Sequence, residues 1–179
     1  MEEFDFLYDS YLVKGSYFNK MIHCGTNYNR WLEIALCYLP RRILFKFKNR
    51  LAFFSTPDRD ACRLPRELCK KREIILLSER ILPKEGAVED QSEVRYFIFS
   101  VLHEIAHVFK KHRFENLTYQ ENQAQENEAD KLAISWFNDH IKLINNPCLK
   151  IITFEEINTV KEKNQKLMEK LYKRSDYIY

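Results

Sequence analysis

The chain has 179 residues, of which 45% are hydrophobic and 31% are charged. This composition is typical of a folded globular protein and excludes a disordered chain. The formal net charge of +3 is too small to indicate nucleic-acid binding by itself. The three glycines form no phosphate-binding loop pattern, so a nucleotide site is not expected either.

The N-terminal segment and the hydropathy pattern indicate the cellular compartment in which the protein is expected. The sequence MEEFDFLYDS is acidic and lacks the apolar stretch of a signal peptide. No apolar run approaches the roughly 18 to 20 residues that a membrane span needs. We therefore expect a cytoplasmic protein without a membrane partner. Its five cysteines are then expected to be free thiols, because that compartment is reducing, and the absence of a CxxC pair argues against a cysteine-based zinc site.

The first half of the chain predicts one helix followed by a small sheet. Residues 28–39 carry apolar side chains at helical spacing, and Pro40 ends that run. Two short apolar runs, 43–47 and 51–54, then flank a polar turn and predict a β-hairpin. A polar connection over 57–71 leads to a third strand candidate at 73–78.

The second half of the chain is predicted to be helical. Helices are expected from about residue 92 to 111, from about 122 to 143, and from a capping-box sequence at 153–156 to about 172. The fold class is therefore α+β, with a small sheet of three or more strands packed on helices. We expect one domain over residues 1–179. Its parts are an N-terminal helix and sheet region (1–91), two site helices (92–145) and a C-terminal helix (150–175).

A metal-ligand pattern lies in the first of these site helices. The stretch HEIAH at 103–107 places His103 and His107 one helical turn apart on one face, where both can reach one ion. Glu104 lies about 100° around the helix, close enough to bind a water molecule rather than the metal. The alternative is a solvated polar face that carries two surface histidines. A third ligand on another element is needed to decide between them.

Three candidates for the third ligand follow in the chain. His112 lacks the spacing and the glycine turn of the metzincin motif, so we reject it. On a helical wheel, Glu126 and Asp130 fall within the apolar face of their helix, where carboxylates are costly unless they are paired or bind a cation. His140 shares this face but lies about 21 Å from Glu126 along the axis. Glu126 is therefore the predicted third ligand.

Asp130 lies one turn beyond Glu126 and is predicted to accept the second ring N–H of a ligand histidine. The alternative for this carboxylate is a buried ion pair with a lysine or an arginine. Two imidazoles and one carboxylate leave a fourth position for water, which is the pattern of a catalytic zinc site. The predicted cofactor is therefore Zn²⁺.

The phrases HEIAH (103–107) and ENEAD (126–130) together resemble the HExxH…ExxxD signature of the gluzincin zinc metallopeptidases. They are similar in particular to the ImmA/IrrE family and to the peptidase core of HtpX-like and CAAX-prenyl proteases, here without membrane spans. The resemblance implies three zinc ligands (His103, His107 and Glu126), a catalytic base at Glu104 and a supporting role for Asp130. It also implies that strand 73–78 forms the sheet edge beside the cleft, where a substrate could bind as an added strand.

The expected function is zinc-dependent hydrolysis of peptide bonds in an intracellular protein, such as a regulator, with Glu104 as general base. Tyr96 and Tyr119 are candidates for stabilising the oxyanion.

The alternative function is a non-catalytic, zinc-stabilised protein-interaction module. In that case the C-terminal helix would contact a partner or a second copy through an apolar stripe bordered by lysines. The simpler interpretation of that helix is core packing with a solvated basic face. A third possibility, nucleic-acid contact through the basic helix and Arg41-Arg42, is weakened by the interleaved Glu162 and Glu169.

Overall fold

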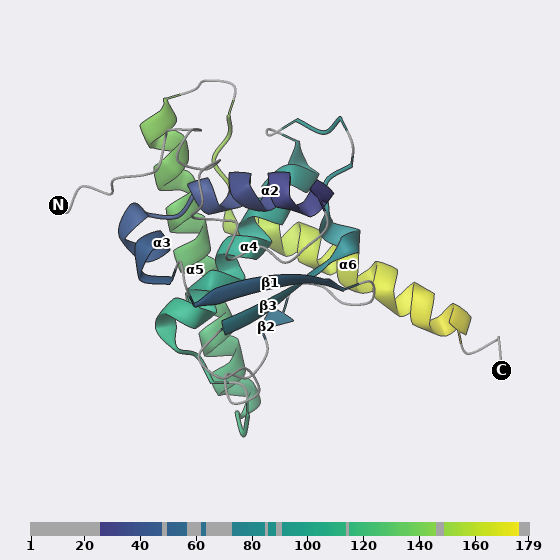
Figure 1. Ribbon diagram of the computed structural model, residues 1–179. Helices are drawn as coiled ribbons and strands as arrows, with labels where there is room; N and C mark the ends of the chain where they lie inside the picture. Colours follow the sequence, from purple (N-terminus) through teal and green to yellow (C-terminus); the bar gives the residue numbers. More distant parts are fainter. Residues whose placement is uncertain are drawn as a thin grey trace.

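The structure is a computed structural model, and it describes residues 26–47, 50–56, 62–63, 73–84, 86–88, 91–113, 115–145 and 149–175. Within these ranges the fold is α+β and mostly helical, as expected (Figure 1). The helices are α2 (Thr26–Cys37), α3 (Arg41–Phe47), α4 (Ser92–Lys110), α5 (Tyr119–Ile144) and α6 (Phe154–Ser175), with a short 3₁₀ helix η2 (Glu79–Ile81). The strands are β1 (Leu51–Thr56), β2 (Cys62–Arg63) and β3 (Glu73–Ser78).

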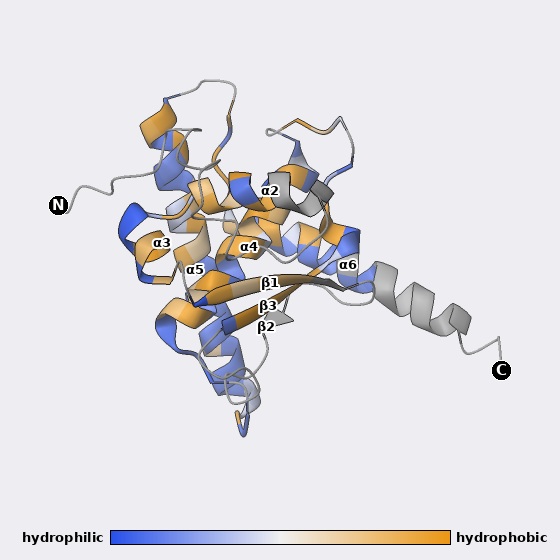
Figure 2. Cartoon of the chain, viewed as in Figure 1, coloured by the Kyte–Doolittle hydropathy of each residue, from blue (hydrophilic) through white to orange (hydrophobic). Residues whose placement is uncertain are grey.

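Helix α4 is the central element of the molecule. It packs against α5, α2 and β3, and it lies between α2 and the sheet (Figure 1). Both faces of α4 are therefore covered along most of its length. Figure 2 accordingly shows α4, β1 and β3 as largely hydrophobic, whereas hydrophilic residues dominate the N-terminal part of α5.

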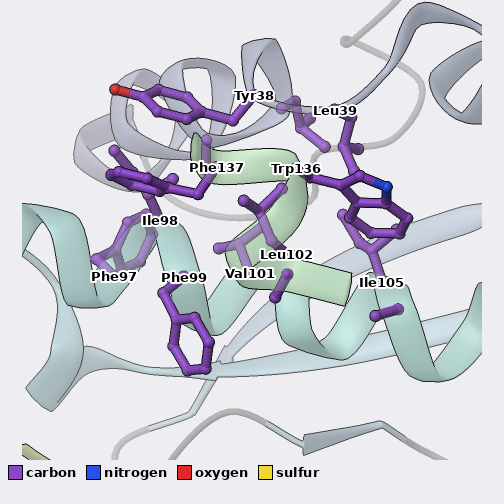
Figure 3. Packing of buried hydrophobic residues seen from close by; sticks show 14 of the residues in the cluster. Tyr38, Leu39, Phe97, Ile98, Phe99, Val101, Leu102, Ile105, Trp136 and Phe137 are labelled. Atoms are coloured by element: carbon purple, nitrogen blue, oxygen red, sulfur yellow. The ribbon is translucent and has the colours of Figure 1, made fainter. Parts of the chain in front are cut away.

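The core includes large side chains of α4, of α5 and of the residues that directly follow α2 (Figure 3). Phe137 of α5 packs against Tyr38, with the ring centroids 4.7 Å apart. Trp136 packs edge-on against Phe109 of α4 at 5.9 Å. Such aromatic pairs stabilise a core beyond the area that they bury. The Trp136–Phe109 pair fixes the position of α5 on α4, and these two helices carry the predicted metal ligands.

The predicted β-hairpin is wrong. Residues 43–47 belong to α3, which begins directly after Pro40, and the carbonyl oxygen of Pro40 accepts the N–H groups of Ile43 and Leu44 at 2.8 and 3.1 Å. The helix buries Ile43, Leu44 and Phe47 but leaves Phe45 44% exposed. An alternating strand would have put Phe45 on the same face as Ile43 and Phe47.

The strand at 51–54 is present, but its partner differs from the predicted one. β1 pairs in parallel with β3, from Leu51 opposite Glu73 to Thr56 opposite Ser78. β2 pairs antiparallel with β3 and comes from the segment that was predicted to be only a polar connection. Lys48 and Asn49 of the predicted turn lie outside the described residues, as does most of that connection.

The strand at 73–78 has the predicted bounds, but it is not the edge of the sheet. The strand order is β1-β3-β2, so β3 is the central strand of the three that the structure describes. The expectation that its edge is open to a substrate strand is therefore wrong. The ladder with the two residues of β2 occupies that side of Ile75 and Leu76.

The two C-terminal helices agree with the prediction apart from their ends. α5 begins at Tyr119, earlier than predicted, because Thr118 and Glu121 form a capping box. In this box Thr118 Oγ1 accepts the Glu121 N–H at 3.2 Å, and Glu121 Oε2 accepts the Thr118 N–H at 2.8 Å. α6 begins after Thr153, whose hydroxyl oxygen accepts the Glu156 N–H at 3.2 Å. Among the described residues, every helix is too short or too polar to traverse a lipid bilayer.

Candidate metal centre

Three side chains from α4 and α5 converge on one point. His103 and His107 come from consecutive turns of α4, and Glu126 comes from the second turn of α5. The two Nε2 atoms are 3.0 Å apart. Glu126 places one carboxylate oxygen 3.3 Å from the Nε2 of His103 and the other 3.5 Å from that of His107. The predicted ligand set is thus brought together, and these three residues could hold a metal ion.

The spacing of these atoms fits a small cation. Zinc binds imidazole nitrogen and carboxylate oxygen at about 2.0–2.1 Å, so two donors of a tetrahedral site lie about 3.3–3.4 Å apart. The nitrogen–nitrogen distance of 3.0 Å and the shorter nitrogen–oxygen distance of 3.3 Å lie near that value, and one ligand atom from each of the three residues lies within 4.8 Å of the other two. The donor chemistry, two imidazoles and one carboxylate, also matches sites that keep one position open for water.

Asp130 contacts the second ring nitrogen of His103. The Nδ1 of His103 lies 2.7 Å from Asp130 Oδ1, at the position that the helical wheel predicted. The negative carboxylate beside Nδ1 favours a proton on that nitrogen, so Nε2, which faces Glu126 and His107, is the ring atom available to a metal ion.

Asp130 also has a second partner. Lys161 of α6 donates to both carboxylate oxygens at 2.8 Å. The two alternatives that the sequence left open for Asp130, contact with a histidine and pairing with a lysine, are therefore both realised. A buried carboxylate with two donors of this kind is compensated for its loss of hydration.

The charges of the site act together on His103. Burial alone would lower its pKa, but hydrogen bonds to Asp130 and Glu126, and the nearby charge of Glu104, outweigh burial and raise the pKa to about 9. The hydrogen bond to His103 in turn holds the pKa of Glu126 below its usual value. Three carboxylates thus favour a positive charge at this point. A bound metal ion would take the place of the proton on His103.

His107 is supported by residues that the sequence analysis missed. Its Nδ1 lies 2.8 Å from the Nδ1 of His112, and the Nε2 of His112 lies 2.9 Å from Glu128 Oε2. Glu128 also accepts a hydrogen bond from Lys110 at 2.6 Å. These two contacts hold the pKa of Glu128 below its usual value. His112 was rejected as a ligand for its spacing, and the structure places it behind a ligand instead.

The remaining candidates lie in different places. Glu104 is buried, with 7% of its surface exposed, and directly follows His103 on α4. His140 is 3% exposed and packs on Tyr38 at a ring separation of 4.1 Å, in the core rather than at the metal centre. Tyr119 is 80% exposed at the first residue of α5.

Comparisons with protein-family models, with curated protein sequences and with solved structures found no match. The function is therefore argued from the residues of the site alone.

Proposed function

We propose that the chain is a zinc-dependent peptidase of the gluzincin type, which hydrolyses peptide bonds of an intracellular protein. One observation carries this proposal. His103 and His107 place their Nε2 atoms 3.0 Å apart, and the two carboxylate oxygens of Glu126 lie 3.3 and 3.5 Å from them, beside the buried Glu104 that directly follows His103. The motif resemblance of 103–107 and 126–130 to gluzincins points to the same chemistry.

The roles of the residues follow from their positions. His103, His107 and Glu126 would hold the ion, and Asp130 orients the ring of His103. A zinc ion bound there would supply a Lewis acid for the scissile carbonyl and lower the pKa of a water molecule. Glu104 accepts the proton of the attacking water and later donates it to the leaving amine. Burial of Glu104 limits competition from bulk water for that proton.

A second candidate function has one observation in its favour. α6 is tied to the site region by Lys161 on Asp130 and by a salt bridge between Arg95 of α4 and Glu156. A bound ion would then stabilise a bundle of three helices without any catalysis. Along α6, Ile157 is buried and Val160 is half-buried, which favours core packing there. The rest of the apolar stripe, Leu167, Met168 and Leu171, has side chains outside the described residues.

The substitution Glu104→Gln separates the two functions. It keeps the shape of the side chain and removes the base, which typically contributes 10²- to 10⁴-fold to the rate. We expect the variant to retain zinc, measured by elemental analysis, and to lose cleavage of a peptide library, measured by mass spectrometry. Glu93→Gln, an exposed glutamate in the first turn of the same helix, is the matched control and should retain both.

Two results would contradict the peptidase proposal. One is a Glu104→Gln variant that keeps both zinc and full cleavage, because a base is then not needed. The other is a wild-type protein that binds zinc at these residues and cleaves no peptide in the library, which favours the interaction module.

A further inference from the structure

A chain of hydrogen bonds runs from the metal centre to the surface behind His107. It passes from His107 to His112 and then to Glu128, with nitrogen–nitrogen and nitrogen–oxygen distances of 2.8 and 2.9 Å. His112 is 8% exposed, whereas the side chain of Glu128 is 49% exposed. Lys110 donates to the other oxygen of Glu128. The proposed ligand set does not include His112, Glu128 or Lys110.

The chemistry of the chain fixes which ring nitrogen carries each proton. A neutral imidazole has one N–H and one acceptor nitrogen. Glu128 can only accept, so His112 carries its proton on Nε2 and offers its Nδ1 as an acceptor. His107 must then donate its own Nδ1–H to His112. The Nε2 of His107 is then its acceptor nitrogen, and it faces Glu126 and His103.

The end of α4 explains how His112 reaches this position. The helix ends in a Schellman-type turn, in which the His112 N–H binds the His107 carbonyl at 3.0 Å and the Lys111 N–H binds the Val108 carbonyl at 3.2 Å. This turn folds His112, which is five residues after His107, back over the last turn of α4. The rings of His107 and His112 accordingly meet edge to face, 4.8 Å apart.

The turn has a conformational cost. Lys111 adopts φ 58° and ψ 40°, the left-handed region that a residue with a Cβ rarely occupies. A glycine would adopt this conformation without strain. Lys111→Gly is therefore a variant that keeps the turn and leaves the side chain of His112 in place.

We propose that His112 is a positioning residue for His107. The ring of His112 transmits the negative charge of Glu128 to the imidazole of His107 and fixes the tautomer in which His107 binds the metal. This inference rests on the proposed metal centre and extends it. Two carboxylates then support the site. Asp130 acts directly on His103, and Glu128 acts on His107 through His112.

Zinc affinity, measured by competition with a chromophoric chelator, tests the proposal without any substrate. His112→Phe keeps a planar ring but offers no acceptor, and we expect about 10- to 100-fold weaker zinc binding. His112→Gln offers a carbonyl oxygen and should recover part of the loss. Glu128→Gln, at the surface, should weaken binding in the same direction by less. Two controls should bind zinc as the wild type does. They are Lys111→Gly and Glu115→Gln, the latter at an exposed carboxylate in the loop that precedes α5.

Long-range ¹H–¹⁵N NMR spectra of the histidine rings, recorded on zinc-loaded protein at about pH 8, above the ordinary histidine pKa, read the tautomers directly. We expect protons on Nδ1 of His107 and on Nε2 of His112. A His112 proton on Nδ1 overturns the proposal, and this measurement does not depend on whether the His112 variants fold. Wild-type affinity in both His112→Phe and Glu128→Gln also overturns it, and leaves the proposed metal site intact. A wild-type protein that binds no zinc removes both.

Discussion

Two buried histidines of this protein have opposite properties. His103 is 8% exposed and His140 is 3% exposed. Burial lowers the pKa of His140 to about 4. Burial also acts to lower the pKa of His103, but hydrogen bonds to Asp130 and Glu126 raise it to about 9. The same residue type is thus a neutral core side chain at one place and a favoured cation at another.

The difference lies in which part of α5 each histidine faces. Glu126 and Asp130 occupy the N-terminal half of α5, where they contact His103. His140 lies about 21 Å beyond Glu126 on the same helix and packs on Tyr38, whose ring also packs against Phe137. Carboxylates rather than burial therefore define the cation site. Of these two buried histidines, only the one with carboxylate partners favours a positive charge.

Removal of a ligand should have the largest effect. His103→Ala, His107→Ala and Glu126→Ala should each weaken zinc binding by more than the roughly 100-fold that the loss of a supporting group causes. Metal content after dialysis and chelator competition measure this. Asn127→Ala, an exposed neighbour of Glu126 on α5, should retain about one zinc per chain. Full zinc retention in Glu126→Ala would exclude Glu126 as a ligand and contradict the comparison between His103 and His140.

The pH dependence of stability tests the other histidine. Unfolded His140 takes up a proton near its ordinary pKa of 6.5, whereas the folded protein does so only near 4. The unfolded state is therefore favoured as the pH falls from about 6.5 to 4, by up to about 3 kcal/mol. Above pH 7 this residue contributes no pH dependence.

Urea unfolding between pH 7 and 4 measures this effect. His140→Leu and His140→Gln both remove the titrating ring, and the loss of stability over this window should be smaller in each. Parallel curves for the wild type and both variants would show that His140 takes up its proton equally well in the folded state, and the contrast with His103 would disappear.

Asp130 gives a smaller effect that sharpens the comparison. Asp130→Asn removes the charge that supports His103, and we expect about 10- to 100-fold weaker zinc binding with the fold retained. Lys161→Met removes only the ion pair with α6, in which the lysine side chain is 36% exposed, and should cost about 1 kcal/mol of stability with less effect on zinc. Lys163→Met, an exposed lysine on α6, is the matched control. If Lys161→Met weakens zinc binding as much as Asp130→Asn does, the ion pair, and not the contact with His103, supports the site.

The convergence of His103, His107 and Glu126 could be predicted because these residues obey helical geometry. His103 and His107 are one turn apart, and Glu126 and Asp130 are one turn apart, so their relative directions follow from 3.6 residues per turn. His112 could not be placed in this way, because it lies past the helix end and depends on the left-handed conformation of Lys111. Lys161 gave no signal at all, because it lies 31 residues from Asp130 on another helix.

The sequence by itself determined the helices α4 and α5, the faces that carry the candidate metal ligands, and the bounds of β3, since these depend on local periodicity. Only the tertiary structure decided that 41–47 is a helix, because an apolar run of five residues fits either a strand or a helix until its packing partners are known. It also decided the sheet order, in which β3 pairs in parallel with β1 across an intervening segment. Pairing partners are long-range choices, made by which apolar faces can be buried together, and no local pattern encodes them.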